Sequence, residues 1–563
     1  MKLNGAHILC DGLVKEGVEI VFGFPGGKVI ELFDTFAHYP QLRFVLVRHE
    51  QAAAHAADAY ARVTGKVGCC VATSGPGATN LVTGIANAHL DSVPMVAVTG
   101  QVDRGSLGRD AFQEVDITGI TLPITKHNYL VMKSDEMAEA VKEAFHIAGT
   151  GRPGPVLIDV PSDVWVEQSE YTYPEKIELP GYKHKLPVYP TQIKKALKAI
   201  SEARRPIIVA GNGVIISNAH VQLKELAEKA QIPVVNTLLG LGCFPQDHVL
   251  SYGMTGMHGM AYANYALNEA DLIVAIGMRF DDRVTSKLST FAPRASVVHI
   301  DIDPAEIGKN VKANVAVVGD VKEVLTALNK DIETLSHGDW LKQIEQWKSD
   351  HPSHEIRDTD RLLPQYVVRC ISDVSGGDAV IVTGVGQHQM WAAQFSVINK
   401  PRSFVSSGGL GTMGFSLPAA IGAQMGRPDE TVWSIDGDGS FQMTLQELAT
   451  IAQEKLPVKI AILNNGYLGM VRQWQEFFWD KRYVATPIAS PDFVKIAEAY
   501  GIEAMRVTNK ADVLPAIEKA TNYDGPFLID FRVEPEENVL PMVKLGSAIS
   551  ELIEQPKSEV STW

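Results

Sequence analysis

Short apolar runs alternate with amphipathic stretches along almost the whole chain. In the first part of the chain, strand-like runs fall at 20–24, 44–47, 68–73, 95–99 and 156–160. These runs are continuously apolar and do not alternate with polar residues, which is typical of parallel strands covered by helices on both faces. We therefore predict an α/β fold built from doubly wound parallel sheets.

The same alternation recurs twice more, which predicts three sheet domains. The second set of runs lies at 206–210, 233–236, 272–276, 297–301 and 315–318, and the third lies at 379–383, 404–406, 431–435, 458–463 and 527–531. The first and third domains share a layout and are predicted to be copies of one architecture. The predicted boundaries are a first domain at 1–166, a linker at 167–190, a central domain at 191–335, a second linker with a surface helix at 336–360, a third domain at 361–533, and a tail at 534–563.

Composition narrows the class of protein. The 563 residues carry a net charge of −15 with no block of like charges, which argues against a nucleic-acid partner. The five cysteines are scattered without a CxxC pair, so a reduced compartment fits and structural zinc does not. The amino-terminal pattern is not that of a signal peptide and no apolar run approaches 18 residues. We expect a cytoplasmic protein without a membrane anchor.

One βαβ unit carries the most specific chemistry. The run at 431–435 leads into the turn DGDGS, a helix is predicted at 441–455, and the run at 458–463 leads into NNGYLG. Adjacent parallel strands bring Asp438 and Asn465 to one sheet edge, where open α/β sheets bind ligands. Magnesium takes a few such oxygens together with phosphate and water, so the pair predicts a metal-bridged diphosphate. For GDG alone an ordinary capped turn is the simpler interpretation, but NN after the next strand favours the metal site.

Three stretches of the first domain have both a structural and a functional interpretation. Glu50 opens an Ala-rich helix, where the helix dipole alone would favour a carboxylate. TSGPGATN, at 73–80, is either a plain turn or a loop that approaches a phosphate. GRDAFQEVD, at 108–116, is either a surface loop or part of a pocket. The tail likewise has one potential helix and is either functionless or able to fold over a site.

The central domain contains two further candidates. HIDID places Asp301 at a strand end, the arrangement in which an acidic residue holds a ribose. MRFDDRVT places Arg279 and Arg283 beside two aspartates, which could also form only a surface ion-pair network.

The motifs together resemble a known family. GDG at 437–439 and NN at 464–465, with 24 residues between them, are similar to the thiamine-diphosphate signature. RHE, SGPGATN, DAFQE, TKHNYLV, MHG, MRFDDRVT, HIDIDPAEIGKN, GVGQHQMWAAQF and SGGLGTMGFSLPAAIGA resemble acetohydroxyacid synthase (acetolactate synthase) catalytic subunits. The resemblance runs in order from about Gly5 to Met542.

The resemblance implies an activity, cofactors and partners. The three domains would bind the pyrimidine of thiamine diphosphate, FAD, and the diphosphate with Mg²⁺, with FAD in a structural role. The reaction would decarboxylate pyruvate and transfer the remaining two-carbon unit to a second 2-oxo acid, pyruvate or 2-oxobutyrate, in the first common step of branched-chain amino-acid biosynthesis. Active sites between subunits imply a homodimer or homotetramer, with a small regulatory subunit as a further partner.

The resemblance also implies roles for single residues. Glu50 matches the glutamate that hydrogen-bonds the pyrimidine ring, and Asp438, Asn465 and the carbonyl of Tyr467 match the metal ligands. The substrate pocket would contain Phe112, Gln113, Arg283 as partner of the acceptor carboxylate, and Trp474 as a shape filter. The other implied thiamine-diphosphate contacts are Gly386, Gln387, His388, Gly411, Met413, Gly437, Gly439, Ser440, Leu468, Gly469 and Met470. The implied FAD contacts are Arg152, Gly211, Asn212, Gly213, Thr237, Leu238, His258, Gly277, Arg279, Asp281, Asp301, Ile302, Asp320 and Val321.

Three departures limit what the resemblance implies. Lys28, Asp103 and Ser162 differ from the usual residues of the channel above the family's active site, so inhibitor sensitivity and acceptor preference do not carry over. The alternative enzyme is a related pyruvate oxidase that uses FAD and thiamine diphosphate, against which MRFDDRVT, DAFQE and RQWQ favour the synthase. Glu50 disfavours a glyoxylate carboligase. A non-enzymatic nucleotide-binding scaffold would keep the sheets without the chemistry.

Overall fold

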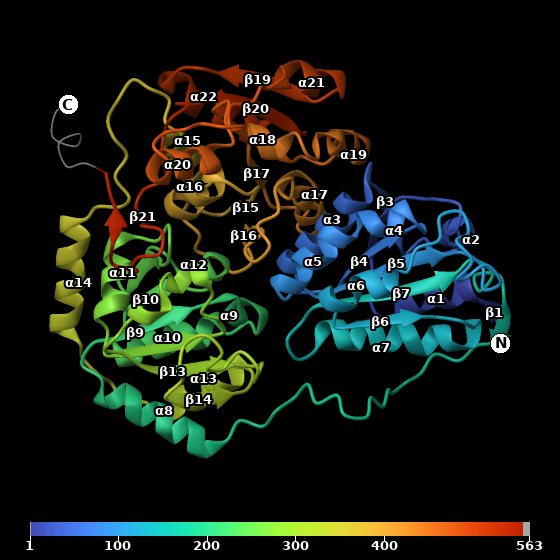
Figure 1. Ribbon diagram of the computed structural model, residues 1–563, viewed down its shortest axis with the longest axis horizontal. Coiled ribbons are helices and arrows are strands. Elements are labelled where there is room, and N and C mark those ends of the chain that lie inside the picture. Colours follow the sequence, from blue (N-terminus) through green and yellow to red (C-terminus); the bar gives the residue numbers. More distant parts are fainter. Residues whose placement is uncertain (1, 556–563) are drawn as a thin grey trace.

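Three parallel sheets form the framework of the molecule (Figure 1). The computed structural model describes residues 2–555, and within them each of the three sheets has six strands. The prediction of an α/β fold with three doubly wound parallel sheets is confirmed. Among the described residues, no helix is long and apolar enough to cross a membrane.

The first sheet has the strand order β3-β2-β4-β5-β7-β6. Helices α1 and α7 cover one face, while α3 and α5 cover the other. The strands are β2 (Ile20–Gly23), β3 (Arg43–Leu46), β4 (Gly68–Ala72), β5 (Met95–Gln101), β6 (His127–Leu130) and β7 (Pro155–Pro161). The helices are α1 (Gly5–Lys15), α2 (Ile30–Phe36), α3 (Glu50–Thr64), α4 (Pro76–Asn80), α5 (Val82–Leu90), α6 (Ile117–Thr121) and α7 (Met137–Gly149).

The third sheet repeats this topology. Its strand order is β16-β15-β17-β18-β20-β19. If the strands of each domain are numbered along the chain, both sheets have the order second, first, third, fourth, sixth, fifth. The strands are β15 (Val380–Thr383), β16 (Phe404–Val405), β17 (Val432–Gly437), β18 (Lys459–Asn464), β19 (Glu503–Val507) and β20 (Phe527–Arg532). The helices are α15 (Pro364–Val374), α16 (Gln387–Phe395), α17 (Ser416–Gly426), α18 (Asp438–Phe441), α19 (Leu448–Glu454), α20 (Gly469–Phe478), α21 (Phe493–Ala499) and α22 (Val513–Asn522).

The central sheet has a different order, β11-β10-β9-β12-β13-β14, which is the order of dinucleotide-binding sheets. The strands are β9 (Pro206–Ala210), β10 (Val234–Asn236), β11 (Ser251–Met254), β12 (Leu272–Ile276), β13 (Ser296–Asp301) and β14 (Val315–Val318). The helices are α8 (Pro190–Glu202), α9 (Asn212–Ile216), α10 (His220–Ala230), α11 (Ala261–Glu269), α12 (Asp282–Thr285), α13 (Val321–Asp331) and α14 (Gly338–Asp350).

The predictions missed one edge strand in each sheet, namely β6, β11 and β19. β6 and β19 are half exposed and mix polar with apolar residues, while β11 is short and contains Ser and Gly. An edge strand packs against one neighbour only and therefore needs no continuous apolar run. A search for such runs finds the inner strands and those edge strands that are themselves apolar, β3, β14 and β16.

The helix predicted at 441–455 is wrong as a single element. The chain forms the short α18, a 3₁₀ turn at Leu445–Glu447 and then α19. The break occurs because Thr444 Oγ1 donates to Gly414 O at 2.9 Å and the buried Glu447 carboxylate accepts from Arg48 N in the first domain at 3.0 Å. The flanking strands reach farther than predicted, to Gly437 and Asn464, and pair in parallel as expected.

The predicted linkers contain structure. Residues Gln168–Glu170 form β8, which pairs antiparallel with β1 (Lys2–Asn4), and the surface helix predicted in the second linker is α14. The domain boundaries themselves stay predictions. In the tail, the described residues 534–555 form the two-stranded β21 (Met542–Val543) and β22 (Leu552–Ile553) without a helix, and residues 556–563 lie outside the described chain.

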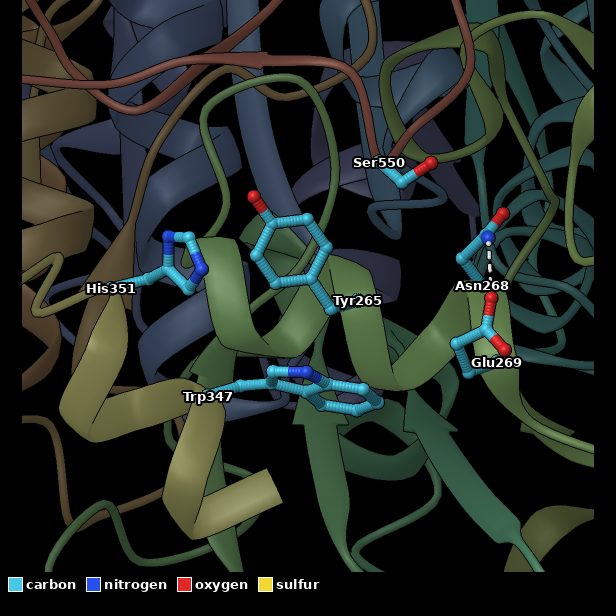
Figure 2. Close-up of a pocket in the computed structure, with 6 residues that line it drawn as sticks. All are labelled: Tyr265, Asn268, Glu269, Trp347, His351 and Ser550. Carbon is cyan, nitrogen blue, oxygen red and sulfur yellow. Dashed lines mark hydrogen bonds between the residues drawn. The ribbon is translucent and has the colours of Figure 1, made fainter. Parts of the chain in front are cut away.

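The tail borders an open pocket on the central domain (Figure 2). Tyr265 of α11, Trp347 of α14 and His351, which directly follows α14, face one another there, with Ser550 of the tail above them. Tyr265 and His351 both hydrogen-bond Glu554, at 3.1 and 2.9 Å. These bonds fasten the tail to the outside of the central domain.

The first and third domains meet through α3 and α17, which lie side by side. A Cβ atom at Gly422 would stand 1.9 Å from Ala56 O, so the backbones of the two helices touch at this point. One apolar core extends across both domains. The two architectural copies are therefore packed together within the chain.

Candidate active site

A pocket opens at the carboxyl ends of β15, β17 and β18, which is where the topology of the third sheet predicts a ligand. Apart from Gly411, every third-domain residue that the resemblance assigns to thiamine diphosphate or to the metal lines it. These residues are Gly386, Gln387, His388, Met413, Gly437, Asp438, Gly439, Ser440, Asn465, Tyr467, Leu468, Gly469 and Met470. Val385, Trp391, Leu463 and Val471 complete the wall, and the sequence interpretation did not single them out.

The predicted metal ligands converge in this pocket. Asp438 Oδ2 accepts from Ser490 Oγ at 2.6 Å and from Gly466 N at 3.1 Å. Asn465 Oδ1 accepts from Tyr467 N at 3.1 Å, while its amide nitrogen donates to Gln387 Oε1 at 3.2 Å. Burial raises the pKa of the Asp438 carboxyl. A buried carboxylate beside an amide oxygen matches what Mg²⁺ takes from a protein when phosphate and water complete its shell.

Three helices begin at this pocket: α16, α18 and α20. None of them has a side chain that caps its first turn. The first N–H groups of a helix have no partner inside the helix and therefore attract anions. The helix dipole, which is positive at this end, strengthens the attraction. Converging uncapped helix starts fit a diphosphate group.

Glycines keep the pocket open. A Cβ at Gly469 would stand 2.0 Å from Gln387 Oε1, and one at Gly437 would stand 2.7 Å from His388 Nδ1. Both positions exclude any larger residue unless Gln387 or His388 moves. The backbone therefore borders the pocket directly at these points.

Two supporting residues were missed by the sequence interpretation. Asp436 is fully buried, and its Oδ1 lies 3.3 Å from His388 Nε2 while Ser416 Oγ donates to its Oδ2 at 3.0 Å. Gln473 accepts from Gln387 Nε2 at 2.9 Å and so orients the amide that meets Asn465. The signals were the first aspartate of DGDGS and a glutamine one turn into α20.

Glu50 lies at the start of α3 and is buried, with an exposed fraction of 8%. Its Oε2 accepts from Asn80 Nδ2 at 2.9 Å, and a Cβ at Gly77 would stand 3.2 Å from its Oε1. Gln113 touches the same turn, since a Cβ at Gly75 would stand 2.9 Å from its backbone carbonyl oxygen. These first-domain residues gather around the SGPG turn, but they do not line the pocket of the third domain in the same chain.

The substrate residues implied by the resemblance come from all three domains. Phe112 is 85% exposed on its loop, Arg283 on α12 is more than half exposed, and Trp474 on α20 is half-buried. Asp281 caps α12 by accepting from Arg283 N at 3.0 Å. None of the three lines the pocket of the third domain in the same chain.

In the central domain, the predicted FAD residues gather where the strand order reverses, between β9 and β12. Gly211 and Gly213 follow β9 and meet Gly277 after β12 so closely that a Cβ at Gly213 would stand 2.6 Å from Gly277 Cα. Thr237 and Leu238 follow β10 at the same sheet edge.

Charged groups surround this edge. Asp301, with Ile302 after it, ends β13, and burial raises its pKa to about 6. Asp320 caps α13, which begins at Val321, by accepting from Lys322 N at 2.9 Å. The remaining predicted contacts have neighbours of their own. Asn212 donates to Asp91 O, Arg152 pairs with Asp303 and Glu306, and Arg279 lies 3.9 Å from Asp281. His258 is buried, and burial and Arg283 lower its pKa to about 4.

Comparison with known proteins supports the motif interpretation. Three family models of thiamine pyrophosphate enzymes match: the N-terminal TPP binding domain at residues 3–120, the central domain at 193–328 and the C-terminal TPP binding domain at 384–531. The acetolactate synthase large subunit of Corynebacterium glutamicum is 51% identical over 98% of this chain and 90% of its own. That of Mycobacterium tuberculosis is 51% identical over 98% and 91%, and that of Porphyra purpurea is 48% identical over 99% and 97%.

These findings confirm the resemblance, and the names of the relatives do not support the pyruvate oxidase alternative. The chain belongs to the acetolactate synthase large-subunit family of thiamine pyrophosphate enzymes.

Proposed function

We propose that the chain is the catalytic subunit of an acetolactate synthase that decarboxylates pyruvate and joins the two-carbon unit to pyruvate or 2-oxobutyrate. The supporting observation is the pocket at the ends of β15, β17 and β18, in a chain about half identical to acetolactate synthases over nearly its whole length. On this proposal the enzyme serves the first common step of branched-chain amino-acid biosynthesis.

The residues of the pocket divide the work of binding. The N–H groups that begin α16, α18 and α20 hold the diphosphate, and Asp438, Asn465 and the carbonyl of Tyr467 hold Mg²⁺. Thiamine diphosphate, when bound, supplies the electron sink that decarboxylation of a 2-oxo acid requires. Met413 lies in the pocket wall beside these groups. Glu50 would hydrogen-bond the pyrimidine ring of the cofactor.

The site is proposed to be completed by a second copy of the chain. Glu50 is buried in the first domain away from the third-domain pocket, which supports a homodimer or homotetramer with intersubunit sites. A small regulatory subunit is a further proposed partner. All five cysteines are free and buried, which supports a reducing, cytoplasmic location.

FAD is proposed to bind the central domain in a structural role. The strand order and the close glycine contact at Gly213 and Gly277 support a dinucleotide there, since such contacts let a pyrophosphate approach the backbone. Joining two pyruvates with loss of carbon dioxide transfers no electrons overall, so the flavin has no redox step to perform. The protein should carry one flavin per chain.

The activity is tested by incubating the purified protein with pyruvate, Mg²⁺, thiamine diphosphate and FAD. Acetolactate is the expected product, with 2-aceto-2-hydroxybutyrate appearing when 2-oxobutyrate is added. Stopped-flow absorbance of the flavin tests the oxidase alternative. Stoichiometric reduction of the flavin by pyruvate at the rate of turnover would identify an oxidase and contradict the proposal.

Replacing Arg283 by Ala should weaken capture of the second 2-oxo acid. A guanidinium binds a carboxylate through two charge-assisted hydrogen bonds, so we expect kcat/KM for the acceptor to fall by about 10- to 100-fold, chiefly through KM. The measurement is product formation against 2-oxobutyrate concentration at fixed pyruvate. Arg294→Ala is the matched control, because Arg294 is similarly exposed and pairs with Glu269 away from the pocket. An unchanged KM would contradict the role.

A further inference from the structure

The loop from Ser406 to Gly414 joins β16 to α17 and places Met413 in the wall of the pocket. Four of its nine residues are glycines, so its backbone has little conformational preference of its own. The third domain holds both ends of the loop: Gly414 N donates to Ser440 Oγ at 2.9 Å, and Gln389 Nε2 donates to Ser406 Oγ at 2.7 Å and to Ser407 O at 3.0 Å. The glycines between these ends need a further support to keep one shape.

That support comes from Asp91, which follows α5 in the first domain. Its Oδ1 accepts from Gly409 N at 2.7 Å, and its Oδ2 accepts from Gly408 N at 3.0 Å. Its side chain is fully buried, and Arg62 Nη2 donates to Oδ2 at 2.8 Å. Both carboxylate oxygens are therefore aimed at consecutive amides of the glycine loop.

Three neighbours extend the contact, and together with Asp91 they form what we call the Asp91 cluster: Asp58, Arg62, Asn87 and Asp91. Arg62 binds Asp58 at 2.5 Å and also donates to Ser406 O at 3.0 Å. Asn87 donates to Asp58 and accepts from Ser407 Oγ at 2.5 Å and Thr412 Oγ1 at 3.3 Å. The cluster thus reaches the loop at Ser406, Ser407, Gly408, Gly409 and Thr412.

Cohesion between the domains does not account for this arrangement. The apolar packing of α3 against α17 already joins the two domains. The cluster buries two carboxylates against one guanidinium, and buried ion pairs add little net stability compared with apolar packing. Directional hydrogen bonds instead fix the geometry of the groups that they contact.

We propose that Asp91 is a positioning residue for the cofactor: it fixes the loop at 408–413 so that Met413 keeps its place in the pocket wall. The inference rests on the proposed binding of thiamine diphosphate at this pocket. Because the diphosphate is held by the starts of α16, α18 and α20, Asp91 affects the ring end of the cofactor and leaves the diphosphate end alone. Asn212 Nδ2 also donates to Asp91 O, at 3.3 Å, so the central domain braces the same residue.

Asp91→Asn tests this role in the full-length protein. One oxygen of the amide can still accept a hydrogen bond, but the NH₂ group faces the second glycine N–H and repels it. We expect the affinity for thiamine diphosphate with Mg²⁺ to fall by about 10- to 100-fold, as for loss of a hydrogen bond to a charged group. The affinity for inorganic pyrophosphate with Mg²⁺ should stay within about 2-fold of wild type, and the near-ultraviolet circular dichroism of the bound cofactor should change.

Asp58→Asn is the matched control, because it removes the other carboxylate from Arg62 without a direct bond to the loop. It should reduce thermal stability about as much as Asp91→Asn but lower the affinity for thiamine diphosphate by less than about 3-fold. If Asp91→Asn fails to fold, Ser407→Ala removes a milder contact of the same loop and should weaken thiamine diphosphate binding by about 5- to 10-fold.

Equal losses for thiamine diphosphate and pyrophosphate, equal effects of the two Asn variants, or wild-type binding by Asp91→Asn would each overturn the proposal. Acetolactate formation by the wild-type protein is measured separately. A wild-type protein that binds thiamine diphosphate without making acetolactate would refute the proposed activity, while a loss confined to thiamine diphosphate would still support the positioning role.

Discussion

Glu50→Gln should slow deuterium exchange at the thiazolium carbon of bound thiamine diphosphate by about 100-fold or more, the size of effect expected when a positioned acid–base partner is removed. Glu50 is held at the start of α3, where Asn80 donates to one carboxylate oxygen and Gly77 leaves space beside the other. The amide cannot share a proton with the pyrimidine ring in the same way, so the neighbouring amino group becomes a weaker base. Quenched-flow NMR of the cofactor measures the exchange.

The exchange experiment has a surface control. Glu19→Gln removes a carboxylate of the same domain that pairs with Lys66 at 2.7 Å and is 62% exposed. It should leave exchange unchanged. Because Gln fills nearly the same space as Glu, Glu50→Gln should keep the fold and the affinity for the diphosphate. A slower exchange with both of these unchanged would show that Glu50 acts in proton transfer and not in folding. Exchange at the wild-type rate in Glu50→Gln would remove Glu50 from the proton transfer.

The sheets could be predicted because their inner strands are buried on both faces. β4, β9 and β18 consist of buried residues throughout, so a continuous apolar run is visible in the sequence. The edge strands β6 and β19 carry His, Asn, Glu and Arg, and their pairing partner is decided by the folded sheet. The break between α18 and α19 was also invisible, because it depends on a bond from Arg48 N to Glu447, 399 residues away in the chain.

Part of the candidate site could also be predicted from the sequence, and part could not. Asp438 and Asn465 were predictable because they follow consecutive strands that pair directly. Asp91 was not, because its bond to Gly408 spans 317 residues and the sequence around it reads as an ordinary helix end. Local pattern therefore found the proposed metal pair, and the family resemblance supplied the other groups proposed to touch the cofactor. The groups that hold them in place come from the packing of one domain on another.

Asp438→Asn should lower the affinity for thiamine diphosphate with Mg²⁺ by about 100-fold or more, since ligand charge sets the affinity of an oxygen site for a divalent ion. The amide oxygen can replace Oδ2 as acceptor for Ser490 Oγ and Gly466 N, and the NH₂ group then occupies the position that the metal requires to be negative. Isothermal titration of the full-length protein at several Mg²⁺ concentrations measures the loss. Unaltered Mg²⁺ dependence would remove Asp438 from the metal site.

The same substitution should stabilise the protein without its cofactor. Asp438 is 1% exposed and burial raises its pKa, so a carboxylate is held there at a cost in folding free energy. A neutral amide of the same shape removes that cost, and we expect a gain of about 1 kcal/mol in the metal-free protein. Asp378→Asn, at an exposed aspartate paired with Lys400, should change neither quantity by a comparable amount. A higher melting temperature together with weaker cofactor binding would show that the Asp438 carboxylate binds the metal at a cost in folding stability. A lower melting temperature would mean instead that this carboxylate mainly stabilises the turn.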